Sequence, residues 1–142
     1  MNKVAIIGAG SLVFTKQLLN DMFNTECMAG TTYFLMGPTM WKLEKMKQYA
    51  QLLIEKNNID AEIICTTDRR EALKDANFVI LTFLVGGNAA YKYDIEIPLK
   101  YGVDQCIGDS LGPGGVFRML RTAPVMAALG KEVDELCPHA YI

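Results

Sequence analysis

Residues 3–13, KVAIIGAGSLV, decide the fold that we predict for this chain. Lys3–Ile7 is a short run rich in β-branched residues, which is typical of a strand buried on both faces of a parallel sheet. In the GAG turn that follows, Gly8 permits a tight turn. Gly10 lets the backbone approach a pyrophosphate at the N-terminus of the next helix. Because the turn follows a strand and precedes a helical pattern, it predicts a dinucleotide-binding unit.

Strand-like and helical patterns alternate along the rest of the chain, which predicts an α/β, Rossmann-like, doubly wound parallel sheet. The further strands are expected at residues 31–36, 61–65 and 77–84, and the helices at 12–24, from Thr39 onward, 68–74 and 117–136. We expect Thr39 to cap its helix and Pro124 to kink or interrupt the last one. Residues 137–142, CPHAYI, resemble the start of another strand, and we assign no element to residues 85–102.

The composition fits one cytosolic domain. The chain has 142 residues, 51% of them hydrophobic, and a net charge of −2. No basic stripe points to nucleic acid or to an anionic membrane. No apolar run is long enough to span a membrane, and the N-terminus lacks a signal-peptide layout. We therefore expect a cytoplasmic location.

The metal-ligating side chains are scattered. The cysteines, Cys27, Cys65, Cys106 and Cys137, form no C-x-x-C pair, and His139 is the only histidine. This spacing does not favour a zinc site, and we expect reduced thiols.

The end of the second predicted strand departs from the usual dinucleotide pattern. An Asp or Glu is expected there to bond the ribose hydroxyls, but this chain has Gly37. One interpretation is a preference for a 2′-phosphate, with Thr39 or Lys42 nearby. The other is a weakened adenosine contact, which we favour because no arginine lies beside Gly37.

The second half of the chain carries a more specific pattern. Residues 96–125, EIPLKYGVDQCIGDSLGPGGVFRMLRTAPV, with the glycine turn, TTDRREAL and VGG, closely resemble the N-terminal part of glycoside hydrolase family 4. Members of this family are NAD- and manganese-dependent glycosidases. The resemblance implies that residues 1–142 form an NAD-binding Rossmann-like domain, the N-terminal third of a member. It also implies that the chain is truncated before the C-terminal catalytic domain.

The resemblance implies a redox-neutral elimination and addition, an exception to the paired-carboxylate scheme of glycosidases. NAD⁺ takes hydride from C3 of the sugar, and the resulting ketone acidifies the C2 proton. A tyrosine removes that proton, the aglycone leaves, water adds and the hydride returns. The Mn²⁺ ion polarises the C3 oxygen as a Lewis acid.

The cofactor-binding residues carry over one at a time. The positions that match the family's phosphate turn are Gly8, Gly10, Ser11 and Leu12, and those on the nicotinamide side are Gly86 and Gly87. Val13 stands where a third glycine would serve helix–strand packing.

Asp109 and Tyr91 carry the implied catalytic and substrate roles. Asp109 matches the acidic residue that raises the basicity of the family's catalytic tyrosine, although a role as a turn residue is also open. Members that act on 6-phosphoglycosides have an arginine upstream of the proline that matches Pro98, where this chain has Tyr91. An arginine fork suits phosphate and a phenol does not. The substrate is therefore expected to be unphosphorylated, unless Tyr91 merely packs in a helix. Residues 104–115, DQCIGDSLGPGG, most resemble the α-galactosidase branch of the family, which implies an α-galactoside.

The family's metal-binding cysteine and histidine, its Asn-Pro segment and its catalytic tyrosine have no match in this chain. Cys137 and His139 do not correspond to those ligands. We therefore expect no glycosidase activity from this chain alone. Family members are homo-oligomers, and a separate C-terminal half is a conceivable partner.

The sequence leaves two other interpretations. A non-catalytic, degenerate nucleotide-binding remnant would explain Gly37. A lactate/malate-type dehydrogenase shares the fold, but FLVGGNAAYKYD, residues 83–94, lacks the arginine of that class's mobile loop.

Overall fold

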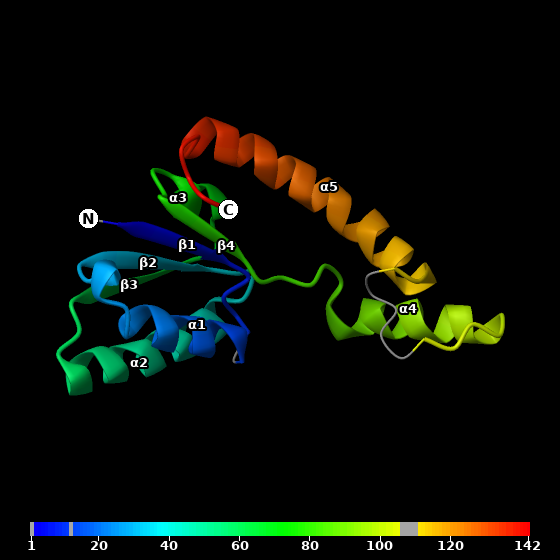
Figure 1. Cartoon of the computed structure of the whole chain (residues 1–142), viewed down its shortest axis with the longest axis horizontal. Coiled ribbons are helices and arrows are strands. Elements are labelled where there is room, and N and C mark those ends of the chain that lie inside the picture. The colour runs from blue at the N-terminus through cyan, green and yellow to red at the C-terminus, as the bar shows by residue number, and fades with distance from the viewer. Residues whose placement is uncertain (1, 12, 106–110) are drawn as a thin grey trace. The chain divides into compact units, whose positions relative to one another are not determined.

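The computed structural model describes residues 2–11, 13–105 and 111–142. The chain divides into two compact units. Unit 1 comprises Met1–Phe83 and Glu132–Ile142, and unit 2 comprises Leu84–Lys131. Figure 1 shows the order of the elements along the chain.

Unit 1 contains a four-stranded parallel sheet in the order β3-β2-β1-β4. Its strands are β1 (Lys3–Ile7), β2 (Thr31–Met36), β3 (Ala61–Thr66) and β4 (Phe78–Leu81). In Figure 1, α1 (Phe14–Phe23) and α2 (Met40–Asn57) lie on one side of the sheet, and the short α3 (Arg69–Leu73) lies on the other. The predicted α/β, Rossmann-like parallel sheet is confirmed.

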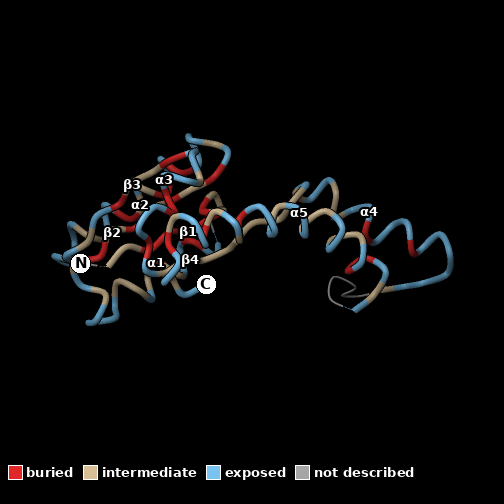
Figure 2. Tube along the Cα trace, turned by 90° about the horizontal axis from the view of Figure 1, so that it is seen from above, coloured by how far each residue is buried: buried red, intermediate tan, exposed pale blue. Residues whose placement is uncertain are grey.

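The core of unit 1 lies between the sheet and the helices α1 and α2. The buried residues that form it are Val4, Ile6, Ala9, Leu19, Tyr33, Leu35, Leu43, Met46, Ala50 and Ile63. In Figure 2 the strands carry most of the buried trace. Burial continues along β1 from its second residue, whereas along β2 it alternates. A five-residue helix such as α3 is too short to cover the second face of β2 fully.

Two local predictions in unit 1 need correction. Thr39 is the N-cap residue of α2, but its side chain makes no capping hydrogen bond. The N-cap residue of α3 is Asp68, whose carboxylate accepts a hydrogen bond from the Arg70 N–H. The predicted fourth strand is shorter than expected, since β4 ends at Leu81. A 3₁₀ turn at Glu26–Met28 was not anticipated.

The end of the chain supports the expected fifth strand. Tyr141 forms an isolated parallel bridge with Phe78, and the Val79 N–H donates to the Tyr141 carbonyl at 2.8 Å.

Unit 2 holds α4 (Gly87–Lys100) and most of α5 (Pro113–Leu136), whose residues from Glu132 onward belong to unit 1. No element was predicted for the residues of α4. α5 begins at Pro113, earlier than predicted, and it is continuous through Pro124, which was expected to kink or interrupt it. Among the described residues, no helix is long and apolar enough to cross a membrane.

Candidate functional site

The glycine turn lies at the carboxyl end of β1, one of the two central strands of the sheet. The N–H groups of Gly8 and Ala9 both donate to the Met36 carbonyl at 2.9 Å, which ties the turn to the end of β2. In the strand order, β2 and β3 lie on one side of β1 and β4 on the other, so the turn occupies the topological switch point. Ligands of open α/β sheets bind at such a point.

Gly8 and Gly10 have different surroundings. Gly8 has a φ of 100°, and a Cβ there would lie 2.7 Å from the Thr82 carbonyl carbon and 2.8 Å from the Phe83 nitrogen. Only glycine allows the turn to approach β4 this closely. A Cβ on Gly10 would meet only the side chain of Lys42, at 3.8 Å. Gly10 therefore leaves an open backbone surface of the kind that a pyrophosphate requires.

The start of α1 completes the turn. The Ser11 hydroxyl accepts from the Phe14 N–H at 3.4 Å, so this side chain helps to order the first turn of the helix. Val13, at the third-glycine position, is 63% exposed. Because that side chain does not lie between helix and strand, its substitution for glycine does not prevent helix–strand packing. Leu12 lies outside the described residues.

Gly37 occupies the position where an Asp or Glu that bonds the ribose hydroxyls was expected. A Cβ on this buried glycine would lie 3.8 Å from the Gly10 nitrogen and 3.3 Å from Leu43 Cδ2. A side chain at position 37 would therefore border the glycine turn directly. Lys42, on the first turn of α2, places its stem against the same turn.

Unit 2 contains the second pair of glycines. Gly86 precedes α4 with a φ of 80°, and Gly87 follows with a φ of 57°. A Cβ on Gly86 would lie 2.5 Å from Ala90 Cβ and 3.7 Å from Arg121 Nε. The backbone here also requires glycine, which leaves the turn compact. Tyr91 lies in α4 and is half-buried, whereas Asp109 lies outside the described residues.

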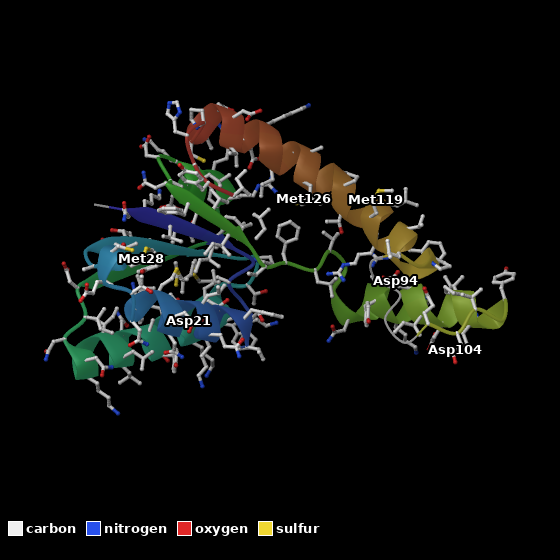
Figure 3. The ribbon with its side chains drawn as sticks, viewed as in Figure 1. Asp21, Met28, Asp94, Asp104, Met119 and Met126 are labelled. Atoms are coloured by element: carbon white, nitrogen blue, oxygen red, sulfur yellow. The ribbon has the colours of Figure 1, made fainter. Side chains whose placement is uncertain are left out.

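A buried ion pair in unit 2 was not predicted. Arg121 in α5 donates two hydrogen bonds of 2.6 Å to the two carboxylate oxygens of Asp94 in α4. Asp94 is 1% exposed and is labelled in Figure 3. Its hydrogen bonds raise the pKa of Arg121 above the ordinary value for arginine. Gln105 extends the network by donating to the Asp94 carbonyl and accepting from the Gly114 N–H.

A second set of ion pairs joins α3 to the last turn of α5 within unit 1. Arg69 binds Glu132 through two hydrogen bonds of 2.6 and 2.7 Å, and Arg70 binds Glu135 in the same way. The hydrogen bonds from Arg69 lower the pKa of Glu132. Positive charges at a helix N-terminus interact unfavourably with the helix dipole. The two arginines at the start of α3 could therefore have indicated acidic partners elsewhere in the chain.

The described side chains offer no metal site. The described residues contain no group of three or more His, Cys, Asp or Glu side chains that could hold a metal ion. The free cysteines among them are Cys27, Cys65 and Cys137.

The family model for family 4 glycosyl hydrolases matches residues 3–142. The chain belongs to this family. Its relatives include an α-galactosidase of Rhizobium meliloti, 40% identical over 134 residues, which span 94% of this chain and 27% of the relative. An α-galactosidase of Bacillus subtilis is 37% identical over 142 residues, 99% of this chain and 33% of the relative. An α-glucosidase of Erwinia rhapontici is 34% identical, over 99% of this chain and 31% of the relative.

A similar fold occurs in a 6-phospho-α-glucosidase from gut microorganisms, solved in complex with NAD and Mn²⁺. The TM-score is 0.84 at 24% identity, over 99% of this chain and 32% of that one. The family 4 chain described here thus spans about a third of the length of the relatives it matches. The match to this family also sets aside the lactate/malate-type dehydrogenase interpretation.

Proposed function

We propose that this chain is the NAD-binding, N-terminal part of an α-galactosidase-like family 4 glycosidase, with residues 1–142 as its nucleotide-binding domain. The observation that carries the proposal is the glycine turn at the switch point. The backbone of Thr82 and Phe83, just after β4, leaves no space for a side chain at Gly8, whereas Gly10 leaves an open surface for a pyrophosphate. The family match and the α-galactosidase relatives support the choice of enzyme class.

In this proposal the bound nicotinamide cofactor supplies reversible hydride transfer to and from the sugar. The chain's own residues hold and orient the cofactor. The backbone around Gly10 approaches the pyrophosphate, and the positive end of the α1 helix dipole faces it. From the family resemblance, Gly86 and Gly87 are assigned to cofactor binding, and Asp109 is assigned to tuning a tyrosine base that has no match in this chain.

The substrate in this proposal is a neutral α-galactoside. Tyr91 supports it, because a phenol offers no charge-assisted hydrogen bonds to a sugar phosphate. The glucosidase among the relatives makes other neutral glycosides the nearest alternative. We place the protein in the cytoplasm, where free thiols such as those of Cys27 and Cys137 stay reduced.

We also propose that this chain alone does not hydrolyse glycosides. The described residues provide no metal-binding group, and we found no match to the family's catalytic tyrosine. The Mn²⁺ ion and the tyrosine base would then come from a further polypeptide segment or a separate C-terminal half, in a homo-oligomeric assembly.

Thermal unfolding in the presence of NAD⁺ tests the proposal. Saturable stabilisation by the cofactor is expected, because a ligand that binds only the folded state raises its stability. No stabilisation at millimolar cofactor would favour the alternative, a non-catalytic remnant, which the missing carboxylate at Gly37 supports. Turnover of an aryl α-galactoside by the chain with NAD⁺ and Mn²⁺ would contradict the proposed inactivity.

A further inference from the structure

The cofactor preference of the proposed nucleotide site is encoded next to the glycine turn. A carboxylate at the end of β2 bonds the ribose 2′-hydroxyl of NAD and repels the 2′-phosphate of NADP. Here that position is Gly37, and a Cβ on it would lie 3.8 Å from the Gly10 nitrogen. The position at the end of β2 that normally selects NAD therefore carries no negative charge here.

Two acidic side chains that follow the neighbouring strand β3 have partners of their own. Beyond β3, which is next to β2, the Asp68 carboxylate accepts from the Arg70 N–H and Glu71 binds the Thr66 hydroxyl. The first turn of α2 carries no acidic residue. These observations remove the usual source of repulsion for a 2′-phosphate.

Lys42 supplies a positive charge on this side of the turn. Its Cβ and Cδ both lie 3.8 Å from the place of a Gly10 Cβ, so the stem runs along the turn rather than away from it. Within the described part of the chain, Lys42 makes no ion pair. Its Nζ lies 5.7 Å from the Trp41 ring centroid, a loose contact that leaves the ammonium exposed.

Thr39 adds a hydroxyl between Gly37 and Lys42 in the sequence. It is the N-cap residue of α2, yet its side chain makes no capping hydrogen bond. The hydroxyl is therefore available to a ligand. A lysine ammonium is a suitable point-charge partner for phosphate, even without the fork of an arginine.

We propose that this site accepts the 2′-phosphate of NADP, with Lys42 as the residue that selects it and Gly37 as the position that permits it. This inference rests on the proposed dinucleotide site and names its cofactor preference. It reverses the sequence-based expectation of a merely weakened adenosine contact. That expectation depended on the missing arginine and not on the course of the Lys42 side chain.

The test compares pairs of ligands that differ only in the 2′-phosphate. Isothermal titration of the 142-residue chain with NAD⁺ and NADP⁺, and with 5′-AMP and 2′,5′-ADP, measures the contribution of that phosphate directly. We expect the phosphorylated member of each pair to bind about tenfold more tightly, as for one charge-assisted hydrogen bond. The substitution Lys42→Gln should remove this difference between the two members of each pair.

Lys47→Gln is the matched control, since it makes the same charge change on the same helix. Lys47 instead borders a surface cavity with Glu62 and Ile63 of β3. This variant should keep the wild-type preference. NAD⁺ binding about tenfold more tightly than NADP⁺ would overturn the inference and leave the proposed nucleotide site intact. Equal loss of preference in both lysine variants would also overturn it, and failure to bind either dinucleotide would overturn the site itself.

Discussion

The two glycines of the turn should respond in opposite ways to the same added methyl group. In Gly8→Ala the new Cβ would lie within 2.8 Å of three backbone atoms of Thr82 and Phe83. Those atoms follow β4 directly, and the Thr82 N–H donates to the Ile7 carbonyl at 2.8 Å. Because the strand ends are hydrogen-bonded to each other, they cannot separate without losing that contact.

The cost of Gly8→Ala has two parts. A non-glycine residue at a φ of 100° carries a backbone strain of about 1–3 kcal/mol. Overpacking against a fixed neighbour adds about 1–3 kcal/mol. The sum, about 2–6 kcal/mol, is a large share of the roughly 5–15 kcal/mol that stabilises a typical domain. Urea denaturation should show this loss as a lower midpoint.

Gly10→Ala should do the reverse. Its Cβ would make only ordinary contacts at 3.8 Å with Lys42, so the unfolding free energy should change by no more than about 0.5 kcal/mol. The methyl group would, however, occupy the surface proposed for the pyrophosphate, and dinucleotide affinity should fall at least about tenfold. Wild-type stability of Gly8→Ala, or wild-type affinity of Gly10→Ala, would refute this division of roles.

Three further predictions concern other parts of the structure. Gly37→Asp should raise NAD⁺ affinity by about 1–3 kcal/mol, the range for a charged hydrogen bond. Gly37→Ala, which adds only the Cβ beside Leu43, should not raise it. Calorimetric titration of both variants with NAD⁺ measures the difference. The pKa of Glu132 is lowered in the folded state, so its stabilisation is present above the ordinary value of 4.5 and is lost as the pH falls through the folded pKa. Glu132→Gln should therefore flatten the acid limb of the stability curve, and an unchanged limb would argue against this pair. Asp94→Asn should lower the thermal midpoint by several degrees because Arg121 loses its charged partner, whereas Asp104→Asn, at an exposed position of unit 2, should leave the midpoint unchanged (Figure 3).

The sheet was predictable because its information is local. β1 is a continuous apolar run that ends at two glycines, and β2 and β3 are apolar runs of similar length, so each strand could be recognised without its neighbours. The glycine turn was likewise predictable, since Gly8 and Gly10 immediately follow β1. The sequence could not show that the Thr82–Phe83 backbone lies close to Gly8, because these residues follow β4, which is distant in the sequence.

The missed features depend on distant partners or on unusual helix composition. α4 begins with two glycines at positive φ and contains Pro98, so its local propensity argues against a helix. The Asp94–Arg121 pair joins residues 27 positions apart, and Arg69 meets Glu132 across 63 positions. No local pattern identifies such partners, because many other charged residues lie at comparable separations.

Chemical-shift mapping of the backbone amides during a dinucleotide titration tests the central claim most directly. The account predicts saturable shifts at Gly8, Gly10 and the start of α1 with either NAD⁺ or NADP⁺. Additional shifts at Thr39 and Lys42 are expected only with NADP⁺. Shifts confined to other surfaces, or none at millimolar dinucleotide, would contradict a nucleotide site at this turn.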